Sequence, residues 1–260
     1  MKKKFLAGVT ILILLFGIVG FANADGTYLV YASGGSQYVL EGAMASLGFS
    51  YDVRDASNPV TASDLSSGDY EALVIGWSAG SYDMSGLDSA ILTAGITGNK
   101  ILTGHDADYH TYYGNAAAAT FMERAVLFSG AADETGILAF PVYASDPFSY
   151  LPASWGLSAF DSFSSENITA ITSAGDYSGL YAGLTTAELS NWGQSFHAAF
   201  SETGSFDVFE LGYGTAADQI VTIGTTVTPV IIDRVPEPAT FLLLGTGLFG
   251  LMGLRRKLNK

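Results

Sequence analysis

The segment Ala72–Trp77, with the sequence ALVIGW, constrains the fold of this chain more than any other segment. Its six residues show no alternation of polar and apolar side chains, which is typical of a central strand buried on both faces. Sheets of this kind are covered by helices on both sides and occur in layered α/β proteins. We therefore expect this segment to lie at the centre of an α/β domain.

The chain around this segment alternates between short apolar strands and amphipathic helices. We expect strands at Thr27–Ser33, Tyr51–Asp55, Lys100–Thr103 and Ile137–Phe140, and helices at Ser36–Leu47, Leu87–Gly95 and Ala116–Phe128. Gly48 is placed to end the first helix, and Asn115 is placed to cap the last one. This alternation predicts a doubly wound, mostly parallel sheet.

The second half of the chain is less regular. Thr185–Glu188, with the sequence TTAE, is a capping box and predicts a helix that runs to about Phe200. Phe206–Gly212 and Gln219–Val227 predict two closing strands, which we expect to pair with each other as antiparallel neighbours. Residues 25–227 then form one acidic α/β ectodomain.

The amino-terminal end falls outside this folding unit. Residues 1–24 combine three lysines, the apolar run Phe5–Phe21 and the sequence Ala-Asn-Ala. This order is typical of a secretory signal peptide and predicts cleavage before Asp25. The alternative, an uncleaved amino-terminal anchor, stays open.

The negative charge of the chain is concentrated in its middle. The full chain has a formal net charge of −14, but Asp25–Asp233 contains 24 acidic residues against only Arg54, Lys100 and Arg124, a net charge of −21. Such a body repels polyphosphates and attracts cations, which excludes nucleic acid as a partner. The chain has no cysteine, so the exported protein has neither disulfide bonds nor thiolate chemistry.

The carboxyl-terminal end has three parts in a fixed order. A linker at 228–238 contains Pro-Glu-Pro, Ala239–Leu254 is apolar and uncharged, and residues 255–260 are basic. As a helix the apolar run covers roughly 24 Å, which is marginal for the ~30 Å hydrocarbon core of a bilayer. Because positive charge favours the cytoplasmic side, we expect a transmembrane helix with a cytoplasmic tail.

This end of the chain resembles a PEP-CTERM sorting signal. The residues that carry the resemblance are Val235, Pro236, Glu237 and Pro238, with Arg255 and Arg256 as the stop signal. The resemblance implies a protein exported by a Gram-negative bacterium that makes exopolysaccharide. It also implies an inner-membrane tether and a membrane transpeptidase, the exosortase, which cuts near Pro-Glu-Pro and delivers the body to the cell surface or extracellular matrix. From the residues alone, an ordinary tail anchor after a proline turn is the alternative.

The segment Asp69–Asp108 resembles part of a class I glutamine amidotransferase-like or flavodoxin-like domain. It shares with them the order of strand, glycine-rich loop, helix, glycine and strand. The amidotransferases use a cysteine after the later strand, where this chain has Gly104, His105 and Asp106. The resemblance therefore implies a fold and carries over no amidotransferase activity.

One candidate site is a serine nucleophile. The sequence GWSAG at 76–80 matches the G-x-S-x-G elbow of serine hydrolases, and Asp176 and His197 follow Ser78 in the order that a catalytic triad needs. The alternative is a chance match in a chain rich in glycine and serine. Residues 81–86 suggest a loop where the elbow requires a helix, and His197 lies within a predicted helix.

A second candidate site is the sequence GHDADYH, which follows the predicted strand Lys100–Thr103. It contains His105, Asp106, Asp108 and His110. Ligands bind at the carboxyl ends of parallel strands, and two imidazoles with two carboxylates can hold a divalent cation. The spacing matches no established metal motif. The alternative is a polar loop in which Asp106 caps backbone amides.

Two functional interpretations follow. We favour a non-enzymatic surface or matrix protein without a cofactor, which binds a cation such as calcium or a polysaccharide. The rings of Tyr109, Tyr112 and Tyr113 are suited to stacking on sugars. The alternative is an exported hydrolase that uses either Ser78 or a metal ion.

Overall fold

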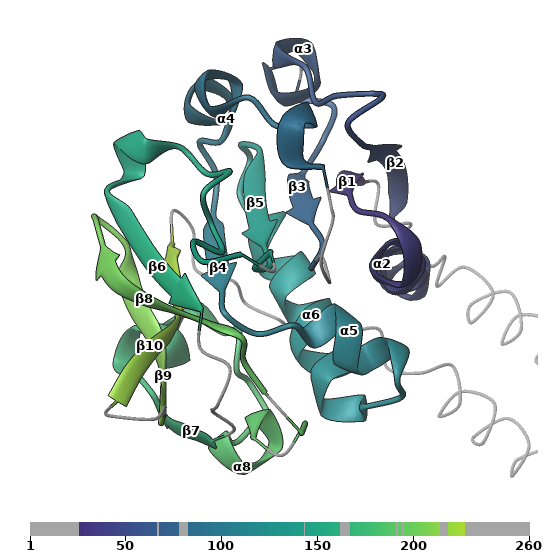
Figure 1. Cartoon of the computed structure of the whole chain (residues 1–260). Coiled ribbons are helices and arrows are strands. Elements are labelled where there is room, and N and C mark those ends of the chain that lie inside the picture. Colours follow the sequence, from purple (N-terminus) through teal and green to yellow (C-terminus); the bar gives the residue numbers. More distant parts are fainter. Residues whose placement is uncertain are drawn as a thin grey trace, which may run out of the picture. The chain divides into compact units, whose positions relative to one another are not determined.

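One sheet of ten strands organises the residues that this computed structural model describes (Figure 1). These residues are 26–66, 68–77, 83–142, 144–161, 167–190, 192–193, 195–213 and 218–226. The predicted signal peptide, linker, transmembrane helix and basic tail lie outside them. Over the described ranges, no helix has the length and apolar character needed to cross a bilayer.

Parallel strands form one half of the sheet. They are β1 (Thr27–Tyr31), β2 (Ser50–Arg54), β3 (Ala72–Ile75), β4 (Lys100–Thr103) and β5 (Gly136–Ala139). As predicted, β3 is central and fully buried, with β1 on one side and β5 on the other. The order β2-β1-β3-β5-β4 differs from the flavodoxin order 2-1-3-4-5 by an exchange of the last two strands. The flavodoxin-like fold is therefore not confirmed.

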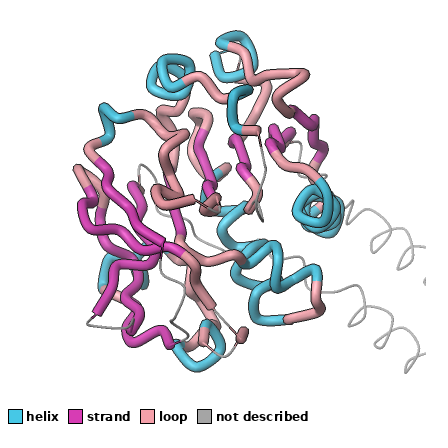
Figure 2. Tube along the Cα trace, viewed as in Figure 1, coloured by secondary structure: helices cyan, strands magenta, loops and turns pink. Residues whose placement is uncertain are grey.

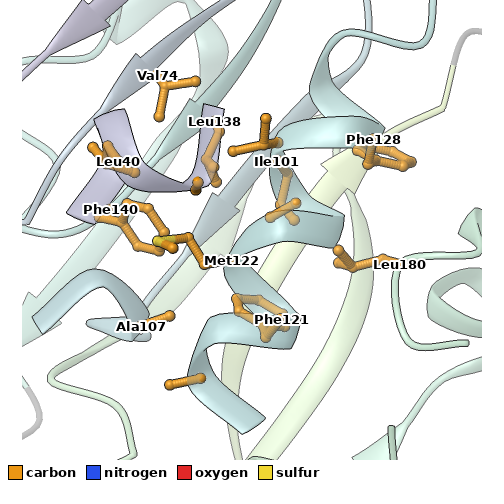
Figure 3. Packing of buried hydrophobic residues seen from close by; sticks show 14 of the residues in the cluster. Leu40, Val74, Ile101, Ala107, Phe121, Met122, Phe128, Leu138, Phe140 and Leu180 are labelled. Atoms are coloured by element: carbon orange, nitrogen blue, oxygen red, sulfur yellow. The ribbon is translucent and has the colours of Figure 1, made fainter. Parts of the chain in front are cut away.

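Helices cover both faces of the parallel half. One face carries α2 (Gly34–Leu47), α5 (Ala107–Tyr112) and α6 (Ala116–Ser129), and the other carries α3 (Ala62–Ser66) and α4 (Ser89–Gly95). Successive residues of a strand point to opposite faces, so Val74 packs in the first core and Leu73 in the second. In the first core, Leu40 of α2 and Met122 of α6 lie close to Val74 and Leu138 of the sheet (Figure 3).

Antiparallel strands form the other half of the sheet, which is grouped at the left of Figure 2. They are β6 (Leu157–Asp161), β7 (Asn167–Ile171), β8 (Ala198–Thr203), β9 (Asp207–Tyr213) and β10 (Asp218–Thr225). β10 joins the two halves because it pairs with β4, β8 and β9. The predicted antiparallel pair of closing strands, β9 and β10, is confirmed. Two short helices, α7 (Ser173–Ser178) and α8 (Thr186–Leu189), belong to this half, and short 3-10 turns lie at Met84–Gly86 and Ala153–Trp155.

The predicted helix from Thr185 to about Phe200 is wrong beyond its first turn. The capping box begins α8 as expected, but the helix ends at Leu189. The side chains that suggested one apolar helical face are divided between two cores. Leu189, Trp192 and Phe196 pack in the first core, and Phe200 packs in the second because it lies on β8.

Gly104 joins the two halves of the sheet where β4 ends. Its N–H donates to the carbonyl of Val221 at 2.7 Å, and its carbonyl accepts from the N–H groups of His197 at 2.8 Å and Ala198 at 3.3 Å. A Cβ atom on Gly104 would overlap the carbonyl oxygen of Ala198. Only glycine allows the chain after β4 to approach the start of β8 this closely.

We expect Gly104→Ala to lower the free energy of unfolding by about 1–3 kcal/mol, because its methyl group forces two packed backbone segments apart. Gly42→Ala is the matched control, since Gly42 lies on α2 with open space around it. Alanine there should raise stability by about 0.5–1 kcal/mol. Urea denaturation followed by circular dichroism measures both changes. Wild-type stability of Gly104→Ala would contradict the close approach.

Candidate metal site

Asp106 lies in the connection from β4 to α5, at the carboxyl end of the parallel strands (Figure 1). Ligands of open α/β sheets bind at such ends. Asp106 is the N-cap residue of α5, but its side chain accepts no capping hydrogen bond, so the expected cap does not form. His110 follows four residues later, about one helical turn, which places both side chains on the same side of α5.

His197 completes the site from the extended segment just before β8. Oδ1 of Asp106 is 3.2 Å from Nε2 of His110, and Oδ2 of Asp106 is 3.1 Å from Nε2 of His197. The Asp106 side chain is fully buried, whereas the side chains of His110 and His197 are 11% and 16% exposed. A buried carboxylate thus lies between two imidazoles that reach the surface.

The partners of the buried Asp106 carboxylate are the two imidazoles, one at each of its oxygens. Burial by itself raises the pKa of Asp106, but the imidazoles of His110 and His197 outweigh burial and hold this pKa below its ordinary value. Asp106 is therefore an anion, and a buried anion needs a partner such as these imidazoles or a metal ion.

The three side chains fit a divalent transition-metal ion. Zinc in proteins is tetrahedral with nitrogen and oxygen ligands at about 2.0–2.2 Å, so neighbouring ligand atoms are roughly 3.3 Å apart. One ligand atom from each of the three residues lies within 4.8 Å of the others, and each imidazole approaches a different oxygen of Asp106. The partial exposure of both imidazoles leaves room for a further ligand from solvent.

His105, which we expected at the metal site, points into the protein core. Its Nε2 is 2.9 Å from Oε2 of Glu210, and its Nδ1 donates to the carbonyl oxygen of Ser195. Oε2 of Glu210 also accepts from the hydroxyls of Tyr181 at 3.1 Å and Thr222 at 2.7 Å. Burial lowers the pKa of His105, but Glu210 outweighs burial and raises it. The two residues form a buried imidazolium–carboxylate pair.

Asp108 also belongs to the interior. Its Oδ2 accepts from the N–H of Trp77 at 2.8 Å and from the hydroxyl of Ser36, and its Oδ1 accepts from the N–H of Tyr109 at 3.0 Å. Burial raises the pKa of Asp108 to about 6, although these hydrogen bonds oppose the shift. Asp108 therefore ties Trp77, two residues after β3, to the first turn of α5.

The structure brings two of the four GHDADYH candidates together, Asp106 and His110, and places His105 and Asp108 elsewhere. The third member, His197, was assigned from the sequence to a different site. That assignment placed it inside a helix, where it could not reach α5. The chain has only three histidines. This small number was the one sequence signal that favoured considering all three as ligands of a single site.

The predicted serine site is only partly described. Ser78 lies outside the described residues. Asp176 is exposed on α7, and the carboxylate beside His197 is that of Asp106. The serine-hydrolase hypothesis therefore stays a prediction.

We expect Glu210→Gln to lower the free energy of unfolding by about 3–5 kcal/mol, because it leaves the charge on His105 buried without its partner. Glu202→Gln is the matched control, since Glu202 is exposed on β8. Its effect should stay within about 0.5 kcal/mol. Guanidinium denaturation measures both, and equal stabilities of the two variants would show that His105 is buried uncharged.

The end of the chain matches a known sorting signal. Residues 234–257 match the family described as the PEP-CTERM protein-sorting motif, and this range contains the predicted Pro-Glu-Pro sequence, apolar run and basic residues. No curated protein and no solved structure matches the chain. The chain therefore carries a PEP-CTERM protein-sorting motif and is an exported protein sorted through exosortase.

Proposed function

We propose that the exported body of this protein binds one divalent transition-metal ion through Asp106, His110 and His197. The observation that carries the proposal is the convergence of one ligand atom each from Asp106, His110 and His197 within 4.8 Å, with the buried carboxylate lying between the two imidazole nitrogens. Buried charges in proteins are paired or coordinate metal ions. A cation at this point would contact one oxygen and two nitrogens at once.

The donor set favours a transition metal over the calcium ion suggested by the acidic composition. Calcium takes six to eight oxygen ligands, whereas two of the three donors here are imidazole nitrogens. Zinc and other first-row divalent metals bind imidazole readily. The net charge of −21 over Asp25–Asp233 supports the proposal, because it raises the local concentration of cations.

Metal-dependent hydrolysis is the second candidate function. Structural zinc sites have four protein ligands, whereas catalytic zinc sites have three and keep a position for water or substrate. The partly exposed side chains of His110 and His197 favour the second arrangement. Asp106, His110 and His197 would hold the metal, which would supply activation of water for hydrolysis of ester or amide bonds.

We further propose the route by which the body reaches its place of action. The apolar run Ala239–Leu254 tethers the exported body to the inner membrane until exosortase cuts near Pro236–Pro238. The released body then resides at the cell surface or in the matrix, with exopolysaccharide as its expected neighbour. The PEP-CTERM match supports the processing step, and the basic residues after the apolar run support the orientation.

We expect the protein, purified in detergent and treated with a chelator, to bind one equivalent of Zn²⁺ or Co²⁺ in calorimetry. Asp106→Asn, His110→Ala and His197→Ala should each weaken binding by about 100-fold or more, because each removes one of three ligands. Tetrahedral cobalt absorbs visible light more strongly than octahedral cobalt, so the spectrum of the Co²⁺ form reports the coordination.

Asp176→Asn is the matched control, since it removes an exposed carboxylate on α7 and should leave metal affinity unchanged. Circular dichroism of each variant checks that the fold is kept. Stoichiometric binding that survives all three ligand substitutions would refute the site. Ester hydrolysis that requires the metal and persists in Ser78→Ala would favour the metal-dependent hydrolase over the serine hydrolase.

For the sorting route, we expect an epitope tag fused after Lys260 to be absent from the mature protein in a host that has exosortase. Glu237→Ala should keep the tag, because it alters the motif that exosortase reads. Deletion of residues 235–260 should release the body uncut into the medium, because no tether remains. Immunoblots of membrane and medium fractions measure all three. A tag retained on the mature wild-type protein would contradict the proposed processing.

A further inference from the structure

Four aromatic side chains form a continuous strip beside the candidate metal site. The ring centroids of Trp77 and Tyr109 are 4.7 Å apart, those of Tyr109 and Tyr113 are 4.8 Å apart, and those of Tyr113 and Tyr112 are 5.2 Å apart. We call these four residues the aromatic strip. Its outer end is open to solvent, since Tyr112 is 56% exposed and Tyr113 is 68% exposed.

The inner end of the aromatic strip touches both histidines of the candidate metal site. The ring centroids of Tyr109 and His110 are 5.4 Å apart, and those of Trp77 and His197 are 5.9 Å apart. A ligand lying along the strip would therefore run from exposed tyrosine rings toward the partly exposed imidazoles. The metal site and the inner end of the strip are therefore adjacent.

The strip is fixed in place by the buried carboxylate of Asp108. This one side chain accepts from the backbone N–H groups of Trp77 and Tyr109, which come from different elements. Tyr113 is the C-cap residue of α5, and its N–H donates back to the carbonyl of Tyr109 at 3.3 Å. Aromatic rings held on an ordered backbone lose little conformational entropy when a ligand binds.

The ligand class follows from charge and shape. The strongly acidic body disfavours an anion, and the four rings contain no carboxylate that would pair with a cation. Tyrosine and tryptophan offer flat apolar faces with polar groups at their edges. A neutral sugar ring has the complementary form, because one of its faces consists of C–H groups and its rim carries hydroxyls.

We propose that the aromatic strip binds a neutral saccharide chain, with one sugar ring stacked on Tyr113 and the chain directed toward the candidate metal site. The part of this inference that concerns the metal rests on the proposed function. Stacking on Tyr113 does not depend on it. The strip therefore selects a ligand whose rings are uncharged and flat. The hydroxyl groups of that ligand reach the candidate metal site.

Calorimetry and tryptophan fluorescence with defined oligosaccharides test the proposal, because Trp77 lies within the strip. The probes are the neutral cellohexaose and maltohexaose, an anionic oligogalacturonate and a cationic glucosamine hexamer. Full-length protein in detergent, loaded with Zn²⁺, should bind at least one neutral probe and should prefer it to both charged probes. Tyr113→Ala should weaken this binding about tenfold, since a stacked aromatic ring typically contributes that much.

Tyr177→Ala is the matched control, because Tyr177 is also 68% exposed but lies on α7. It should bind the probe as the wild type does, and Tyr113→Phe should also keep most of the affinity because stacking needs the ring and not the hydroxyl. Equal loss in Tyr113→Ala and Tyr177→Ala would overturn the proposal. So would a preference for a charged probe, or an absence of binding to both neutral probes.

Zinc affinity measured on the same samples separates this inference from the proposed function. Tyr113→Ala should bind Zn²⁺ as the wild type does, so its loss of saccharide binding is not a loss of metal. Asp106→Asn, which removes a metal ligand, should keep stacking but bind the neutral probe more weakly than the zinc-loaded wild type. Wild-type zinc affinity without saccharide binding would overturn the strip and leave the metal site standing.

Discussion

The hydrogen bond from the backbone N–H of His197 to the carbonyl of Gly104 is the contact on which the candidate site depends. It joins the chain that leaves β4 to the chain that enters β8, and therefore the parallel half of the sheet to the antiparallel half. Asp106 lies just after one of these segments, and His197 lies at the start of the other. Without this close approach the two segments would be connected only through β10, which lies between β4 and β8.

The site also depends on three neighbouring residues that point in different directions. His105 extends into the core toward Glu210, Asp106 turns to the two imidazoles, and Asp108 anchors the segment that follows β3. A turn from a strand into a helix separates successive side chains in this way. The interior contacts of His105 and Asp108 hold the backbone on both sides of Asp106. The carboxylate of Asp106 is then held between the imidazoles of His110 and His197 because its position is set by its neighbours.

The sequence predicted the parallel half of the fold well because its signals are local. Apolar runs such as ALVI, the αL glycine at Gly48 and the Asn115 cap depend on a few adjacent residues, and each is found where expected. The start of α8 was predicted for the same reason, but its end was not. Phe200 lies on a strand and not on a helix because β8 pairs with β6 and β10. This pairing joins residues far apart in the sequence, so the local spacing of apolar residues does not predict it. The sequence therefore also failed to predict the third residue of the candidate site, because His197 lies in the segment just before β8.

The position of the site at the junction of the two halves gives metal binding a structural consequence. Ligands from α5 and from the segment before β8 meet only after β10 has paired with β4 and β8, so the unfolded chain offers no preformed site. Binding to the folded state alone adds to its stability, by about 2.7 kcal/mol at a free metal concentration 100 times the Kd. This chain has no disulfide to constrain it after export. A metal ion bridging Asp106, His110 and His197 would therefore act as its cross-link, and would do so at the surface where the aromatic strip begins.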